Sequence, residues 1–119
     1  MRVSAQEFRD HVAKPSKYRN QPITLDGIRF ASKLEARYFS LLKLREKAGE
    51  VFNVELQKRY PLIGPDGMLV CTFVADFVFW DQREKRQRIV DTKGVETAAF
   101  KIKKKLMKSL LGLEVEIVK

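Results

Sequence analysis

Histidine and cysteine are almost absent from this sequence. His11 is the only histidine and Cys71 the only cysteine among 119 residues. One histidine excludes zinc sites built on paired histidines and ribonuclease chemistry that needs two imidazoles. One cysteine excludes an internal disulfide and fits a reducing compartment. Any hydrolytic chemistry must therefore depend on carboxylates, lysine and a hard metal ion.

Long apolar runs are also lacking. No segment approaches the roughly 20 apolar residues that a membrane-spanning helix needs, and no apolar block of a signal peptide follows the N-terminus. We therefore expect a cytoplasmic protein that makes no membrane contact. The sequence has no internal repeat, so its 119 residues are expected to form one compact domain.

Positive charge is what the sequence has in excess. The chain holds 24 Lys and Arg residues against 15 Asp and Glu, a formal net charge of +9. On a small domain this excess is typical of a protein that binds a polyanion, and nucleic acid is the commonest such partner. A soluble basic protein without such a ligand is the alternative.

Turn and capping signals predict an α/β (α+β) fold. A helix from Ser4 to about Ala13 and a basic arm make up residues 1–22, and residues 23–119 form the main domain. The expected elements of the main domain are a hairpin about Asp26-Gly27, a helix over 32–48, strands over 51–58, 68–80 and 88–93, a helix over 97–111 and a strand over 114–118. This αβββαβ order predicts a mixed central sheet flanked by helices.

Two acidic residues stand where the pattern demands apolar ones. Asp76 lies in the middle of the apolar strand FVADFVF, where aspartate is a poor strand former and a buried charge is costly. A buried ion pair is the structural alternative. Glu35 falls within the apolar arc of its helix, but it also occupies the capping-box position after Ser32 and could simply cap the helix.

Three further charged residues complete the candidate set. Asp91 and Lys93 are two residues apart on a strand and therefore point the same way; alone, such a pair usually marks a surface salt bridge. Lys103 lies within the apolar arc of the last helix, where it either extends to solvent or contacts phosphate. Glu55 and Gln57 either border the site or lie on a solvated strand face.

The order Glu35, Asp76, Asp91-x-Lys93 on an αβββαβ core resembles the PD-(D/E)XK nuclease superfamily. The finer resemblance is to its phage Holliday-junction-resolvase-like endonuclease family. It is carried by KYRNQPITLDGIRFASKLEARYF, VELQ, FVADFVFW, IVDTKG and TAAFKIKKKL. Two positions depart from the family pattern, because Ala75 replaces the proline that names the motif and Asp91 replaces the commoner glutamate.

The resemblance implies an Mg²⁺-dependent DNA endonuclease, with Mn²⁺ able to substitute. It implies that Asp76 and Asp91 ligate the metal, that Glu35 completes the site and that the carbonyl of Thr92 is a further ligand. Lys93 would serve the attacking water and the phosphate, and Lys103 would be a neighbour on the phosphate side. The family also implies a homodimer in the host-cell cytoplasm, if the gene belongs to a phage.

DNA contacts are expected along the basic arm and the outer face of the last helix. The residues are Lys17, Tyr18, Arg19, Lys101, Lys104, Lys105 and Lys108. Two other functions stay open on the sequence alone. One is a restriction-like or transposase-associated cutter of duplex DNA, and the other is a basic DNA-binding protein without catalysis, which leaves Asp76 unexplained.

Overall fold

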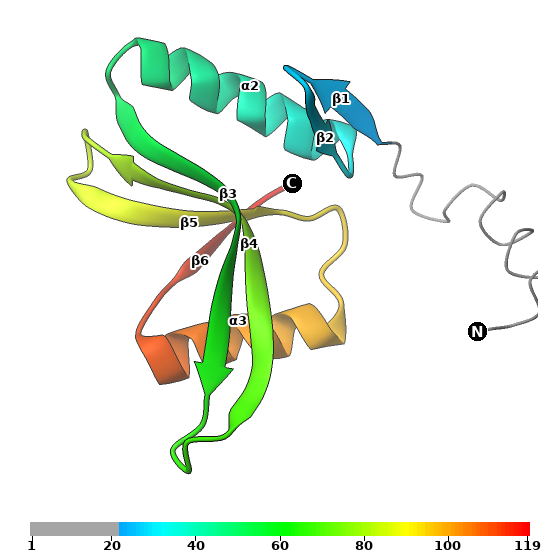
Figure 1. Ribbon diagram of the computed structural model, residues 1–119, viewed down its shortest axis with the longest axis vertical. Coiled ribbons are helices and arrows are strands. Elements are labelled where there is room, and N and C mark those ends of the chain that lie inside the picture. Colours follow the sequence, from blue (N-terminus) through cyan, green and yellow to red (C-terminus); the bar gives the residue numbers. More distant parts are fainter. Residues whose placement is uncertain (1–21) are drawn as a thin grey trace, which may run out of the picture.

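The protein has an α+β fold built on a mixed sheet (Figure 1). The structure is a computed structural model that describes residues 22–119. Its elements are β1 (Ile23–Leu25), β2 (Ile28–Phe30), α2 (Lys33–Lys47), β3 (Val51–Ile63), β4 (Leu69–Asp81), β5 (Arg86–Thr92), α3 (Ala98–Leu111) and β6 (Val115–Val118). The order from α2 to β6 confirms the predicted αβββαβ core. The predicted N-terminal helix and the arm with Lys17, Tyr18 and Arg19 lie outside the described residues.

The two helices begin and end where their capping residues predict. Ser32 Oγ accepts a hydrogen bond from the backbone N–H of Glu35, and Thr97 Oγ1 accepts one from Phe100. Gly112 ends α3 with a φ of 70°, a left-handed conformation that favours glycine. None of the helices within residues 22–119 is long and apolar enough to cross a membrane.

The main sheet has the strand order β3-β4-β5-β6, with β5 and β6 parallel and the other pairs antiparallel. The two helices cover opposite faces of it (Figure 1). On the α2 face, Phe39 and Leu42 pack against Phe77. On the α3 face, Phe100 and Met107 belong to a second buried cluster. The chain therefore has two small cores, one on each side of the sheet.

Strand β4 is longer than the part of it that β5 accompanies. The β4–β5 ladder runs only from Phe77 to Asp81 on β4, while β3 follows β4 back to Leu69. In Figure 1 the β3–β4 hairpin therefore leaves the rest of the sheet and extends past α3. The sheet forks just before Phe77, and the candidate site lies at this fork.

Three details differ from what the sequence pattern indicates. Strand β3 was predicted over 51–58 but continues through Pro61 to Ile63, because β3 is an edge strand, where the missing N–H of proline removes no essential ladder bond. Ile102 of α3 is apolar but 59% exposed. Asp81 is charged, yet it ends β4 and is 1% exposed.

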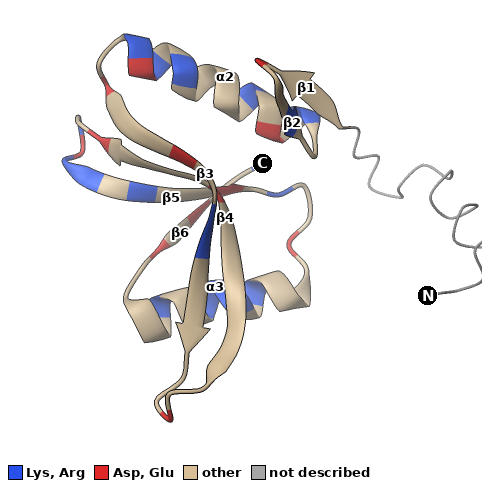
Figure 2. Ribbon diagram, viewed as in Figure 1, with Lys and Arg blue, Asp and Glu red and all other residues tan. Residues whose placement is uncertain are grey.

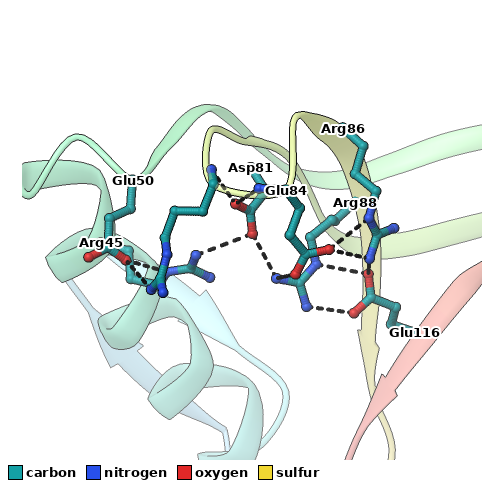
Figure 3. A network of polar contacts seen from close by, with 8 residues as sticks. Arg45, Glu50, Asp81, Glu84, Arg86, Arg88 and Glu116 are labelled. Carbon is teal, nitrogen blue, oxygen red and sulfur yellow. Dashed lines mark hydrogen bonds and ion pairs between the residues drawn. The ribbon is translucent and has the colours of Figure 1, made fainter.

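Asp81 organises a network of charges at the β4–β5 turn, where charged residues gather (Figures 2 and 3). One of its oxygens, Oδ2, accepts from Arg45 of α2 at 3.2 Å and from Arg88 of β5 at 2.9 Å. Arg88 in turn pairs with Glu116 of β6 at 2.6 Å. Burial alone would raise the pKa of Asp81, but these arginines and the backbone N–H groups of the turn outweigh it and lower the pKa. The network joins α2 and three strands at the end of the sheet away from the fork.

Candidate active site

Asp76 and Asp91 face each other at the fork between β4 and β5. The last regular ladder pair is Phe77 with Val90, and the next position brings the two aspartates together. Their side chains replace the ladder there, since the backbone N–H of Asp76 donates to Asp91 Oδ1 at 2.9 Å. The N–H and hydroxyl of Thr92 both donate to Asp76 Oδ2, also at 2.9 Å. The structure thus brings two predicted site residues into direct contact.

Glu35 joins the pair from the first turn of α2. It is 6% exposed and lies beside the buried Phe39 and Leu42, as the helical periodicity predicted. Its Oε1 accepts from the backbone N–H of Ala31 at 3.3 Å, so part of its carboxylate does stabilise the helix start. Its Oε2 turns toward the sheet instead. Glu35 therefore uses one oxygen at the helix start and directs the other toward Gln57, and its functional role stays a prediction.

Gln57 connects Glu35 to Asp76. Its Nε2 donates to Glu35 Oε2 at 2.9 Å and to Asp76 Oδ1 at 3.2 Å. The backbone of Gln57 has a φ of 53°, a left-handed conformation that is rare for a residue other than glycine, and the β3–β4 pairing skips this position opposite Asp76. The sequence left its role open, because alternation with Leu56 fits a solvated face equally well. Glu55, the other open candidate, is exposed and pairs with Lys58, so it lies outside the site.

The carboxylates repel one another in a poorly solvated place. Burial and the neighbouring charge of Asp76 raise the pKa of Asp91 to about 7. The same two causes raise the pKa of Glu35. Lys93 offsets part of this repulsion, because its Nζ lies 3.5 Å from Asp91 Oδ2, over the ring of Phe100. Perturbed acids that meet in a hollow are typical of catalytic sites.

The site opens into a hollow of about 480 Å³ that Glu35, Asp76, Thr92 and Lys93 line together. Lys103 lines an adjoining hollow of about 260 Å³ with Asp91 and Lys93, which places it beside the site as predicted. The remaining candidate lysines of α3 gather elsewhere, around a hollow between α3 and the start of β6. They are Lys101, Lys104, Lys105 and Lys108.

The chemistry of the donor set fits a hard divalent cation. Glu35, Asp76 and Asp91 offer oxygens only, which suit Mg²⁺, and a bound cation would relieve the repulsion that raises two of their pKa values. As the side chains stand, no group of three acidic, histidine or cysteine residues within 22–119 is arranged to hold a metal ion. A cation would therefore require the three carboxylates to move closer together.

Comparison with known proteins gave one result. No curated protein and no solved structure matches the chain. The resemblance to PD-(D/E)XK nucleases therefore stays a prediction. A family model described as "Protein of unknown function (DUF1064)" matches residues 15–115. Because that match spans most of the chain, the protein belongs to the DUF1064 family.

Proposed function

We propose that this protein is a Mg²⁺-dependent DNA endonuclease that cuts branched DNA such as a Holliday junction, as its resemblance to PD-(D/E)XK resolvases implies. One observation carries the proposal. Glu35 from α2, Asp76 from β4 and Asp91 from β5 converge on one place, with Lys93 at 3.5 Å from Asp91. Carboxylates from three elements, with a lysine beside them, suit hydrolysis of a phosphodiester.

The carboxylates and Lys93 would have different tasks. When bound by the carboxylates and the Thr92 carbonyl, Mg²⁺ would offset charge on the phosphate and acidify a water molecule. The ammonium of Lys93 lines the same hollow, where it can donate to a phosphate oxygen or orient the attacking water. Gln57 bridges Glu35 and Asp76 through its side-chain amide. Lys103 would approach the phosphate from α3.

Charge supports DNA as the substrate. The chain carries a net charge of +9, and Lys and Arg line much of α3 (Figure 2). Lys101, Lys104 and Lys105 form no ion pair with any residue in the described part of the chain, whereas Lys108 pairs with Glu114 at 2.8 Å. We therefore expect the first three to contribute more to phosphate binding than Lys108.

A homodimer is part of the proposal, because symmetric cutting of a junction needs two sites. The exposed apolar end of the β3–β4 hairpin supports self-association. Met68, Leu69 and Val70 are 66%, 59% and 56% exposed there. Light scattering measures the mass in solution of the wild-type chain and of Leu69→Asp. A monomeric wild-type protein would contradict the homodimer.

The test compares a four-way junction with a linear duplex of the same sequence, in Mg²⁺ and in EDTA. We expect the junction to be cut in Mg²⁺ only. Lys93→Ala and Asp91→Asn should each abolish cutting, whereas Lys47→Ala, an exposed lysine in the last turn of α2, should not.

The outcomes separate the competing functions. Equal cutting of both substrates would replace the resolvase with a restriction-like or transposase-associated duplex nuclease. Binding of both without metal-dependent cutting would leave a basic DNA-binding protein. Normal cutting by Lys93→Ala would refute the assigned role of Lys93 while leaving the nuclease in place.

A further inference from the structure

Three hollows adjoin at the fork of the sheet. Glu35 and Asp76 line the central one, and Asp91 lines the third. A second, of about 240 Å³, shares Ala31 and Glu35 with it and continues to Arg29 on β2. The third, of about 260 Å³, shares Lys93 and Thr97 with the central hollow and continues to Lys103 on α3. The shared lining residues set the three hollows in a row, here called the trough, that crosses the candidate site.

We propose that the strand being cut lies along this trough, with the phosphate on one side of the reacting bond at Arg29 and the phosphate on the other side at Lys103. The inference rests on the proposed nuclease function and adds the path of the substrate. Arg29 lies on the small β1–β2 hairpin, which would then take part in binding the substrate.

The ion pairs of the described residues leave both of these cations available. Neither Arg29 nor Lys103 forms an ion pair with any residue in 22–119. At the far end of the sheet, Arg45 and Arg88 are both held by Asp81 (Figure 3). A cation already bound to a carboxylate has less to offer a phosphate. The two ends of the trough thus present available positive charge on either side of a negative centre.

This arrangement suits a polyanion whose charges repeat along a chain. The carboxylates at the centre repel a bare phosphate, so the flanking cations supply the attraction that keeps the strand in place until the centre is neutralised. Contacts on both sides of the reacting phosphate require a strand that continues in both directions. The substrate is therefore an internal phosphodiester bond, and a free strand end is not needed.

Binding without cutting provides the first test. The full chain is titrated with a fluorescent four-way junction in EDTA at several salt concentrations. The plot of log K against log salt has a negative slope. Its magnitude should decrease by about 1 for Arg29→Ala and for Lys103→Ala, and by about 2 for the double variant. The matched controls Arg37→Ala and Lys47→Ala remove exposed, unpaired cations of α2 within the described chain and should leave the slope unchanged. Equal slopes for the site variants and the wild type would overturn the trough.

Neutral linkages then locate each contact. After the cut is mapped, single methylphosphonates replace the phosphates on either side of it. Wild type should lose cutting rate with either substitution, Arg29→Ala with only one of them and Lys103→Ala with only the other. Loss of response to the same linkage in both variants would overturn the trough but not the nuclease. A wild-type protein that does not cut the junction, whether or not it binds it, would refute the nuclease and with it the path of a cut strand.

Discussion

At position 57 we predict that glycine and alanine reverse their usual order of stability in a strand. At an ordinary strand position, Gly is less stable than Ala by roughly 0.5–1 kcal/mol, because it loses more backbone freedom on folding. Gln57 has a φ of 53° in the middle of β3. A side chain in that conformation costs on the order of 1 kcal/mol or more, which glycine avoids. We expect Gln57→Gly to be more stable than Gln57→Ala.

The magnitude follows from what each variant loses. Both remove the hydrogen bonds to Glu35 at 2.9 Å and to Asp76 at 3.2 Å. Bonds to charged groups contribute about 1.5–3 kcal/mol when buried, and less here because Gln57 is exposed. Alanine should therefore destabilise the protein by about 2 kcal/mol and glycine by about 1 kcal/mol.

Urea denaturation at pH 7 in EDTA measures both free energies of unfolding. Arg59 is the matched control, since it is an exposed residue of the same strand without a positive φ. There glycine should be the less stable variant by roughly 0.5–1 kcal/mol. If alanine proves as stable as glycine at position 57, the strained backbone we assign to Gln57 does not exist.

Other predictions concern the carboxylates. Asp91 has a folded pKa of about 7, above the unfolded value of about 3.9, so its contribution to stability is lost as the pH rises through 7. The free energy of unfolding of Asp91→Asn should therefore exceed that of the wild type by on the order of 2 kcal/mol at pH 8 in EDTA. A variant no more stable than the wild type would contradict this. Asp81 has a lowered pKa, so its contribution to stability is present above pH 4 and lost in acid. Asp81→Asn should lower the free energy of unfolding by about 3 kcal/mol at pH 7. In urea titrations at pH 2–5, its stability should also depend less on pH than that of the wild type. Mg²⁺ at ten times its Kd should stabilise the wild type by about 1.4 kcal/mol in thermal unfolding. If Mg²⁺ stabilises Asp76→Asn by the same amount, the ion does not bind at Asp76.

The sequence predicted those parts of the fold that depend on local patterns. Ser32 and Thr97 begin their helices because a hydroxyl before an apolar period caps the first free N–H groups. Asp76 stood out because a charge in an apolar strand is costly wherever the strand lies. Such signals are contained in a few neighbouring residues and survive any tertiary arrangement.

The fork and the role of Gln57 could not be predicted in this way. A period of two shows which residues share a face, but it does not show where one strand stops pairing with another, so the end of the β4–β5 ladder at Phe77 left no trace in the sequence. The partners of the Gln57 side chain, whose backbone is left-handed, lie 22 and 19 residues away in the chain. The ion pairs of Asp81 could not be predicted for a related reason, because one of its arginines comes from α2, 36 residues away.

Asp81 and Asp91 show how the fold gives two buried carboxylates opposite electrostatic surroundings. Both are 1% exposed, and burial raises the pKa of each. Arg45 and Arg88 bind Asp81, and its pKa falls. Asp91 faces Asp76 instead, and its pKa rises to about 7. The backbone N–H of Asp76 and the partly exposed Lys93 offset only part of that rise.

Backbone and hydroxyl donors explain how this unfavourable pair is held. The N–H of Asp76 and the N–H and hydroxyl of Thr92 fix the two carboxylates without adding a full positive charge. An arginine in their place would neutralise the oxygens and make them poor ligands for a cation. The fork supplies these donors, because strands that part leave N–H groups without a ladder partner. The same break in the sheet thus creates the hollow, orients the acids and keeps their charge available, which is why the site lies where β4 leaves β5.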